Sequence, residues 1–280
     1  MIRRHDRDRF QTALFAPAAR REALFALYAF NYEIARVREV VTEPTLGRIR
    51  LEWWRENVAA AFADGGVRRH DIVEALTVAI RGLGLTRAYF DRLIDAREAD
   101  FAEGPPPSLA ALEDYAEGTS SNLVALALEA LGVRDRATFE AGRHIGIAYA
   151  LAGLLRAAPF LAAMGRPLVP LDLAARVGLE TDPYQRMPGS TALRRAIAEI
   201  AAAASAHLRM ARRQPSPAAA ALPALLPAVV AKHSLKRLRH AGYDPFDPAL
   251  AGPDPLQSWR LAAAVLGQWL RVRRWQRASG

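Results

Sequence analysis

Apolar residues recur every three or four positions along almost the whole chain, and this spacing limits the fold more than any other feature. No stretch shows the sustained alternation, rich in Val, Ile and Thr, of a half-buried β-strand. The chain is therefore predicted to be all-α, with helices that end at Gly- and Pro-rich breaks. The predicted helices span residues 18–40, 44–63, 70–82, 87–103, 108–131, 136–164, 191–213, 218–241 and 255–276.

The breaks between these helices are too short and not polar enough to be interdomain linkers. The chain has 280 residues, of which 51% are hydrophobic, which is enough for one large core. We expect a single domain over residues 1–280, with a basic N-terminal arm at 1–17 and with a C-terminal loop and basic helix at 242–280 packed on it. The absence of cysteine excludes disulfides and thiolate chemistry.

The balance of charge is basic, because Lys and Arg outnumber Asp and Glu by 9 and all but two of the 38 basic residues are arginines. Arginine suits bidentate contacts to phosphate or carboxylate, and the scarcity of lysine argues against Schiff-base chemistry. The basic run Arg271 to Arg277 either complements a helix dipole or contacts anionic lipid. No nucleic-acid partner is expected, because no known nucleic-acid-binding motif accompanies the arginines.

No targeting or membrane-spanning segment is predicted. The first nine residues carry charges of both signs and lack the apolar core of a signal peptide. The longest apolar stretch, Pro217 to Ala231, is interrupted by two prolines and is too short to cross a bilayer. We expect a cytoplasmic protein, peripheral at most on the inner face of the cytoplasmic membrane, or on the matrix side in a eukaryote.

Two predicted helices have compositions that packing alone does not explain. In helix 18–40, Tyr28, Asn31 and Arg38 share one stripe with apolar residues, and such a stripe faces either a core or a lined cavity. Helix 108–131 is interrupted by a small and polar run, Glu117 to Asn122, which favours a loop by propensity. This run indicates either a kinked helix that lines a cavity or a helix-loop-helix.

Five segments, in this order along the chain, resemble the squalene/phytoene synthases. They are FALYAFNYEI at 25–34, RLEWWR at 50–55, and residues 115–131, 146–156 and 165–172. The resemblance implies an isoprenoid-synthase-like helical bundle around a central cavity. Members of that family condense two prenyl diphosphates with Mg²⁺ held by two Asp-rich motifs on facing helices, and the metal neutralises the diphosphate leaving group.

Both Asp-rich motifs are degenerate in this chain. The first contains Ala35 and Arg36 where the resemblance implies acids, and Glu39 is the carboxylate that remains. In the second motif, Ala157, Phe160 and Leu161 stand in place of acids. We therefore predict no catalytic residues, no metal and no cofactor. Mg²⁺ would be needed only if the protein were a divergent synthase. The predicted remnant pocket consists of Tyr28, Asn31, Arg38, Arg50, Trp54, Glu98, Tyr115, Ser121, His144 and Arg156.

A narrower resemblance covers nearly the whole chain. Segments 30–33, 43–47, 115–119 and 155–159 are similar to a degenerate branch of the family that is typified by the mitochondrial respiratory complex I assembly factor 6. This resemblance implies a non-catalytic assembly or scaffold role, with subunits or assembly intermediates of complex I, the NADH:quinone oxidoreductase, as partners. A prenyl lipid and an anionic membrane surface are further candidate partners. The alternatives are a divergent prenyltransferase of the phytoene or squalene type and a prenyl-lipid-binding protein without turnover.

Charged residues near the two motifs have two interpretations each. Arg36 either contacts an anion directly or pairs along its own helix with Glu33. Arg156 lies in an apolar helix, and if it is buried it needs a carboxylate partner. Glu39 or Glu98, each on a predicted facing helix, is our candidate for that partner.

Histidines and acids give no metal-binding pattern in the sequence. The six histidines are scattered, so zinc is not expected, and His144 is interpreted as a core histidine that is satisfied by hydrogen bonds. Asp91, Asp95, Glu98 and Asp100 form an acidic face on one predicted helix. We favour a solvated face with interleaved arginines over a single-metal site there.

Overall fold

The structure is a computed structural model, and it describes residues 1–41, 43–63, 66–102, 104–179, 190–252 and 254–278, with side chains as far as residue 267. These ranges contain helices and no strand, so the all-α prediction is confirmed. The α-helices are α1 (Ile2–His5), α2 (Arg7–Ala13), α3 (Ala18–Ala35), α4 (Val37–Val40), α5 (Pro44–Phe62), α6 (Asp71–Leu83), α7 (Arg87–Ala96), α8 (Leu109–Ala116), α9 (Asn122–Ala130), α10 (Arg136–Ala163), α11 (Leu171–Val177), α12 (Thr191–Arg213), α13 (Leu222–Leu225), α14 (Pro227–His240) and α15 (Gln257–Ala278). Three 3-10 helices, η1 (Arg97–Phe101), η4 (Ala219–Ala221) and η5 (Pro248–Leu250), and the π-helical η2 (Glu117–Ser121) complete the list.

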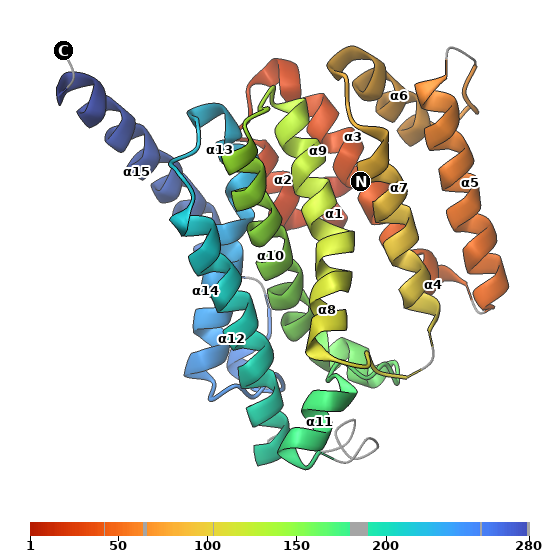
Figure 1. Ribbon diagram of the computed structural model, residues 1–280, viewed down its shortest axis with the longest axis vertical. Helices are drawn as coiled ribbons and strands as arrows, with labels where there is room; N and C mark the ends of the chain where they lie inside the picture. The colour runs from red at the N-terminus through yellow and green to blue at the C-terminus, as the bar shows by residue number, and fades with distance from the viewer. Residues whose placement is uncertain (42, 64–65, 103, 180–189, 253, 279–280) are drawn as a thin grey trace.

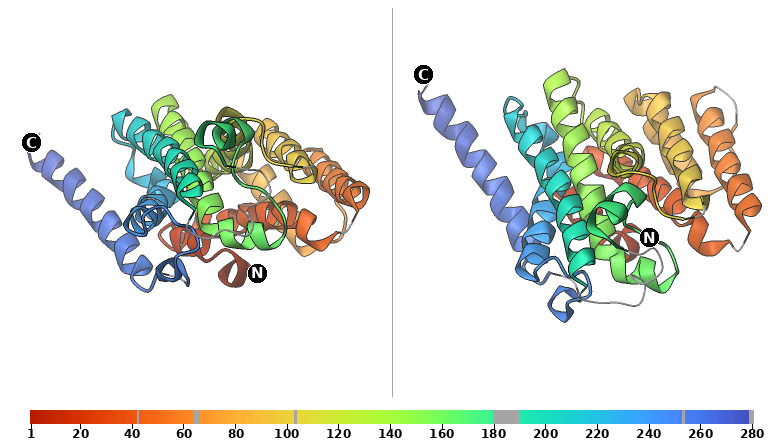
Figure 2. Two further views of the ribbon diagram at one scale, coloured as in Figure 1. Left: turned by 90° about the horizontal axis from the view of Figure 1, so that it is seen from below. Right: turned by 60° about the horizontal axis from the view of Figure 1, so that its bottom comes forward.

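Helix α10 runs through the middle of the bundle, with α8, η2 and α9 on one side and α12 and α14 on the other (Figure 1). It begins at Asp135, whose side chain accepts a hydrogen bond of 2.8 Å from the Thr138 amide and so caps the helix. Two apolar cores meet around α10. One lies among α3, α5, α6, α7 and α9 and contains Phe30 and Phe90, and the other lies among α10, α11, α12 and α14. Figure 2 shows this arrangement from below, with α5 at one edge and α15 at the other.

Helix α10 is also the one helix in the described ranges that is long and apolar enough to cross a membrane. The sequence analysis placed the longest apolar stretch elsewhere, at 217–231, because isolated charges in α10 broke up the pattern. In the structure α10 packs against α9, η2, α12 and α14, so its apolar composition is that of a central core helix.

The polar run in the predicted helix 108–131 remains helical. Helices α8, η2 and α9 follow one another without a loop, and η2 has the wider π-helical spacing. The interpretation as a kinked helix is thus the one that holds, and the helix-loop-helix is wrong. A π-helical turn of this kind inside an α-helix is frequent at functional sites.

Helix α10 and η2 approach each other closely because α10 carries glycine at the crossing. A Cβ atom built on Gly146 would lie 2.5 Å from the Cα atom of Ser121. One turn nearer its N-terminus, a Cβ on Gly142 would lie 3.0 Å from Leu128 and Val124. Glycine at 146 therefore sets how near η2 can lie to α10.

The first 17 residues, which we expected to form a basic arm and in which no helix was predicted, contain two short helices that pack on the bundle. Helices α1 and α2 pack on α3, α13 and α14, and Ile2, Thr12 and Ala13 are buried. Asp6 separates the two helices and caps α2 by accepting a hydrogen bond of 3.1 Å from the Arg9 amide. Helix α11 was not predicted either.

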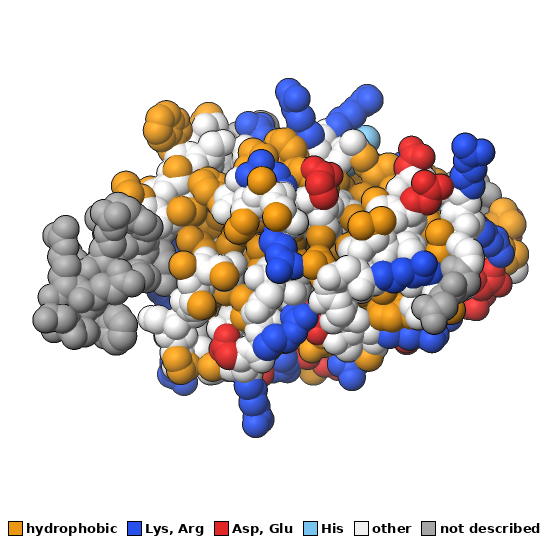
Figure 3. All heavy atoms as spheres, turned by 90° about the horizontal axis from the view of Figure 1, so that it is seen from above, with side chains coloured by type: hydrophobic (Ala, Val, Ile, Leu, Met, Phe, Trp, Pro, Cys, Tyr) orange, Lys and Arg blue, Asp and Glu red, His pale blue; other side chains and the backbone are white. Residues whose placement is uncertain are grey.

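Helix α15 begins beside α14 and leads away from the bundle toward the C-terminus (Figures 1 and 2). Its basic residues, on which the prediction of a lipid contact depends, have side chains outside the described part of the structure. The face of the molecule seen from above shows apolar side chains with single basic side chains and a few acidic ones among them (Figure 3).

We predict opposite effects for two Gly→Ala substitutions in α10. Gly146→Ala should lower the free energy of unfolding by about 1–3 kcal/mol, because its methyl group meets the backbone of η2. Gly153→Ala has open space around the new methyl group and should raise the same quantity by up to about 1 kcal/mol through helix propensity. Urea denaturation of both variants tests this, and equal effects would show that the α10–η2 crossing is not tight.

Candidate functional site

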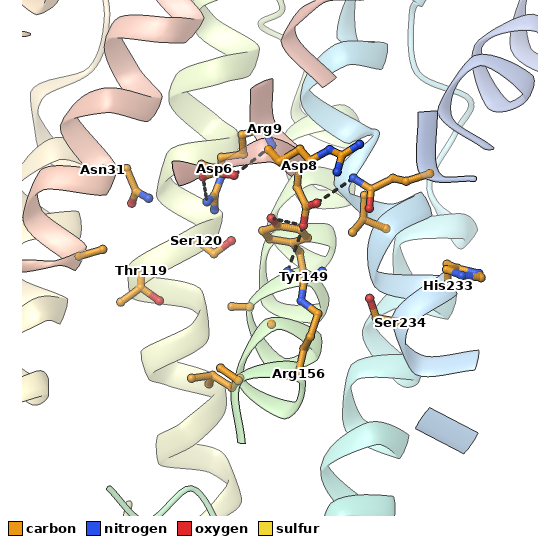
Figure 4. A pocket seen from close by; sticks show the side chains of 18 of the residues that line it. Asp6, Asp8, Arg9, Asn31, Thr119, Ser120, Tyr149, Arg156, His233 and Ser234 are labelled. Carbon is orange, nitrogen blue, oxygen red and sulfur yellow. Dashed lines mark hydrogen bonds and ion pairs between the residues drawn. The ribbon is translucent and has the colours of Figure 1, made fainter. Parts of the chain in front are cut away.

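A cavity of about 560 Å³ lies between α2, α3, η2, α10, α14 and the first turn of α15. Figure 4 shows polar side chains from several of these segments around it. Six arginines and three aspartates line the wall, so the cavity carries an excess of positive charge. The charged and histidine residues of the wall are His5, Asp6, Arg7, Asp8, Arg9, Arg97, Arg156, His233, Arg237, Asp254 and Arg260.

Asp8 connects three parts of the chain at one side of this cavity (Figure 4). Its carboxylate accepts hydrogen bonds from Tyr149 Oη at 3.2 Å, from Arg156 at 3.0 Å and from the amide of Gln257 at 2.8 Å. Burial raises the pKa of Asp8, but the charge of Arg156 and the three hydrogen bonds lower it further, so the pKa lies below its ordinary value. The carboxylate is thereby held ionised, and it ties α2 to α10 and α15.

A second charged group, Arg9, is buried beside Asp8. The Arg9 guanidinium donates to Asp6 at 2.8 Å, and its central carbon lies 5.0 Å from the centre of the Tyr149 ring and 5.9 Å from that of Tyr28. Burial opposes the charge on Arg9, yet the nearby carboxylate of Asp6 raises the pKa of Arg9 overall. Burial likewise raises the pKa of Tyr28 to about 12. The Arg9 guanidinium, paired with Asp6, therefore closes this end of the cavity between the rings of Tyr28 and Tyr149.

Tyr115, which also lines the cavity, is held by a buried charge cluster. Its hydroxyl donates to Asp100 at 2.7 Å and accepts from Arg97 at 3.0 Å, and Arg166 lies 3.4 Å from the same aspartate. Burial raises the pKa of Tyr115 to about 12, so the phenol stays protonated at neutral pH. Asp100 is 8% exposed, which corrects the expectation of a solvated acidic face. The reason is that η1 turns this residue inward, whereas Asp95 remains outside and pairs with an arginine of α5.

The wall between α3 and η2 carries polar atoms without protein partners. Asn31 Oδ1 and Ser120 Oγ are buried and have no hydrogen-bond partner within the protein, although both residues line the cavity. Next to Ser120, the Thr119 hydroxyl donates to the carbonyl oxygen of Tyr115 at 2.7 Å. Unpaired buried polar atoms are costly, so solvent or a ligand in the cavity is needed to satisfy the first two.

The carboxylates of the wall do not fit a Mg²⁺ site. Asp6, Asp8 and Asp254 each have an oxygen atom within 3.0 Å of an arginine nitrogen. Throughout the described ranges, no three His, Cys, Asp or Glu side chains are arranged to hold a metal ion. Mg²⁺ needs near-octahedral coordination by oxygen atoms, which this donor set does not supply.

Comparison with known proteins decides the family. A family model described as squalene/phytoene synthase matches residues 2–264. The chain belongs to the squalene/phytoene synthase family. The structural likeness agrees with this, because squalene synthase HpnC from Alicyclobacillus acidocaldarius superposes with a TM-score of 0.76 at 24% identity, covering 87% of this chain and 92% of that chain.

Curated relatives in this family carry two kinds of name. The chain is 31% identical over 268 residues to the NADH dehydrogenase (ubiquinone) complex I assembly factor 6 of Bos taurus, covering 93% of this chain and 80% of that protein. It is 28% identical over 194 residues to the presqualene diphosphate synthase of Rhodopseudomonas palustris, covering 68% of each. Both the family resemblance and the narrower resemblance seen in the sequence are therefore confirmed.

One residue from each of the two predicted degenerate Asp-rich motifs lines this cavity. Ala35 from α3 and Ala157 from α10 both line it, as do Ala150 and Gly153 one or two turns earlier on α10. From the predicted remnant pocket, three residues line it as well, namely Asn31, Tyr115 and Arg156.

Other predicted pocket residues are buried but lie outside the lining. Tyr28 packs behind Arg9, as described above, and Trp54 packs edge-on against Phe30 with ring centres 5.4 Å apart. Ser121 Oγ donates to the carbonyl oxygen of Arg143 at 2.7 Å. The other predicted residues away from the lining are Arg36, Arg38, Glu39, Arg50, Glu98, His144, Phe160 and Leu161. Of these, Arg36 lies 3.4 Å from Glu33, so the intrahelical pairing is confirmed.

The partner expected for Arg156 is wrong. Arg156 pairs with Asp8 of α2 at 3.0 Å and not with Glu39 or Glu98. Glu98 instead lies 3.5 Å from Arg48, near the surface. The sequence analysis missed this pair because it did not predict α1 and α2 as helices. The signal was present in the alternating charges of residues 6–9, which were used only to exclude a signal peptide.

His144 is a core histidine, but its partner is another histidine. The Nδ1 atoms of His144 on α10 and His207 on α12 face each other at 2.9 Å. The outer Nε2 atoms lie 3.3 Å from Glu140 and 3.1 Å from Glu113, respectively. Burial, followed by repulsion from His207, lowers the pKa of His144. The two rings fasten α10 to α12 provided that they do not both carry a proton on Nδ1.

We predict that Asp8→Asn lowers the free energy of unfolding by about 1–2 kcal/mol at pH 7, because charged hydrogen bonds to α10 and α15 are weakened. Since the folded pKa of Asp8 lies below its unfolded value of 3.8, the contribution is present above about pH 4. It is lost as the pH falls through the folded pKa, so the variant and the wild type should converge in acid. Asp114→Asn, at an exposed carboxylate, is the control, and a pH-independent difference would contradict the prediction.

We also predict that stability falls as the pH drops through the range where a free histidine becomes protonated. The folded pKa of His144 is below the ordinary value of 6.5, so the unfolded chain binds more protons and is favoured from about pH 7 downward. His144→Asn should flatten this decline, measured as the melting temperature between pH 7 and 5. His240→Asn, on the surface of α14, should keep the wild-type slope; if His144→Asn also keeps it, the prediction fails.

Proposed function

We propose that this protein is a non-catalytic member of the squalene/phytoene synthase family that assists the assembly of respiratory complex I, the NADH:quinone oxidoreductase. In this proposal it binds subunits or assembly intermediates at the inner face of an energy-transducing membrane. The proposal goes further than family membership, because the same family also includes proteins named as synthases.

The cavity wall carries the proposal. At two lining positions where the family resemblance implies acids, the wall has the methyl groups of Ala35 and Ala157. An ion pair within the protein, Asp8 with Arg156, lies at the same wall, and every aspartate of the lining is paired with arginine. A diphosphate leaving group needs its charge neutralised at the moment of ionisation, and metal ions are the usual means. This wall supports anion binding by arginine far better than metal-dependent ionisation.

The relatives support the second half of the proposal. The match to proteins named complex I assembly factor 6 extends over 93% of this chain, whereas the match to a presqualene diphosphate synthase extends over 68%. The identities, 31% and 28%, point the same way.

We predict that deletion of the gene from its host lowers the NADH:quinone oxidoreductase activity of isolated membranes severalfold and leaves succinate:quinone oxidoreductase activity unchanged. A copy with Ala35→Leu and Ala157→Leu, which would narrow the cavity, should restore complex I activity if the role is that of a scaffold. Unchanged complex I activity in the deletion strain would overturn the proposal.

The enzymatic alternative is tested with the purified protein. Incubation with farnesyl or geranylgeranyl diphosphate should release no diphosphate, with Mg²⁺ or with EDTA. Mg²⁺-dependent release by the wild type, abolished in Asp8→Asn or Tyr115→Phe, would establish a divergent prenyltransferase instead.

A further inference from the structure

A second cavity of about 380 Å³ adjoins the charged one, between α10, α14 and the segment 245–252. Its wall is largely apolar and includes Leu155, Pro159, Leu235, Leu238, Phe246 and Leu250. Apolar cavities of a few hundred cubic ångströms with a few polar groups at one end are typical of small-molecule sites. Nothing in the architecture of the bundle requires this space to be empty, because larger side chains at these positions would fill it.

Four residues line both cavities and therefore mark where they meet: Arg156, Ser234, Arg237 and Gly252. Figure 4 shows Arg156 and Ser234 on the neighbouring helices α10 and α14, on the same side of Asp8. Arg237 forms no ion pair with any carboxylate of the described residues, and it donates one hydrogen bond of 2.7 Å to the carbonyl oxygen of Ala249. A guanidinium has five N–H groups, so donors remain for a bound anion.

The part of the charged cavity beside Asp8 does not accept an apolar chain. There the buried pair of Arg9 and Asp6 lies between the rings of Tyr28 and Tyr149. An alkyl chain placed against this pair would remove the remaining solvent from buried charges without replacing their hydrogen bonds. The second cavity is thus the place where an apolar chain is favoured, and the arginines at the junction are where its charged end is favoured.

We propose that the joined cavities bind one single-chain anionic amphiphile. Its carboxylate or phosphate head contacts Arg237 and Arg156 at the junction, its chain lies in the second cavity, and no divalent metal takes part. The proposal stands whether or not the protein assists complex I, because it depends on the two cavities alone. Fatty acids, alkyl phosphates and prenyl phosphates share this chemistry, and direct binding distinguishes them.

Calorimetric titration of the purified full-length chain in EDTA tests the proposal. The probes are dodecanoate, dodecyl phosphate and farnesyl phosphate, each below its micelle concentration, with dodecanol as the neutral probe and inorganic phosphate as the chainless one. At least one anionic amphiphile should bind one to one, and about tenfold or more tightly than dodecanol or inorganic phosphate. The anionic probe that binds most tightly identifies which of the three classes of amphiphile the protein prefers.

Matched variants place the ligand in the structure. Arg237→Gln should weaken binding of the best probe by about tenfold, whereas Arg239→Gln, at an exposed position of the same helix, should not change it. Leu250→Glu puts a charge in the wall of the second cavity and should abolish binding, and Leu46→Glu on the surface of α5 is its control. Melting temperatures close to that of the wild type verify that the variants are folded.

Three results would overturn the proposal. Equal affinity for dodecanol would mean that the arginines do not recognise the head, and equal affinity for inorganic phosphate would mean an anion site without a chain site. Absence of binding by all three amphiphiles to the folded wild type would mean that the joined cavities take no ligand of this class. Binding that appears only with Mg²⁺ would contradict recognition by arginine.

Discussion

The ion pair between Asp8 and Arg156 organises the site of this protein. It joins the second helix of the chain to the central helix across 148 positions of sequence, and the same carboxylate also holds the start of α15 through Gln257. Three segments that are remote in sequence thus share one acceptor group. A half-exposed ion pair contributes little by itself, but a carboxylate with three donors also fixes geometry. The cavity has its shape because these segments are fastened at one point.

Charge in the cavity is arranged as pairs within the protein, with a surplus of arginine. In a metal-dependent diphosphate site the carboxylates are the unpaired groups, and the metal joins them to the substrate. Here the carboxylates are neutralised in place and the guanidinium of Arg237 has donors to spare. The electrostatic preference of the wall is therefore for anions directly. The fold is shared with synthases, but a shared fold does not by itself determine the chemistry of the site.

The sequence predicted the long helices because their apolar periodicity extends over many turns, as in 44–63, 136–164 and 191–213. It did not predict α1 and α2, which have four and seven residues and are too short for an apolar periodicity to show. Because these two helices were not predicted, part of the site was not predicted either. Without them the partner of Arg156 was wrongly sought in Glu39 or Glu98, and Asp6, Asp8 and Arg9 were absent from the predicted site. Helix α15 also contributes site residues that were not predicted, because Gln257 and Arg260 reach the cavity from the far end of the chain.

Within single helices the sequence was more informative. Asn31 was singled out because it shares a stripe with apolar residues, and it does line the cavity. His144 was assigned to the core, but its pairing with His207 depends on how α10 and α12 cross, which no local pattern records. Contacts between elements, rather than the elements themselves, account for most of what the sequence left open.

The π-helical turn η2 has an evolutionary consequence. A π turn contains one residue more than a regular α-helical turn. This extra residue rotates the following part of the helix by about 100° relative to the preceding part. Thr119 and Ser120 face the cavity in that wider turn, while α9 still presents Leu126 and Leu128 to the core. Deletion of a single codon within 117–121 would restore a regular helix. The polar residues could then not face the cavity while the leucines of α9 face the core. A ligand preference built on this wall can thus change by insertion or deletion, a route that comparison of substitutions alone would overlook.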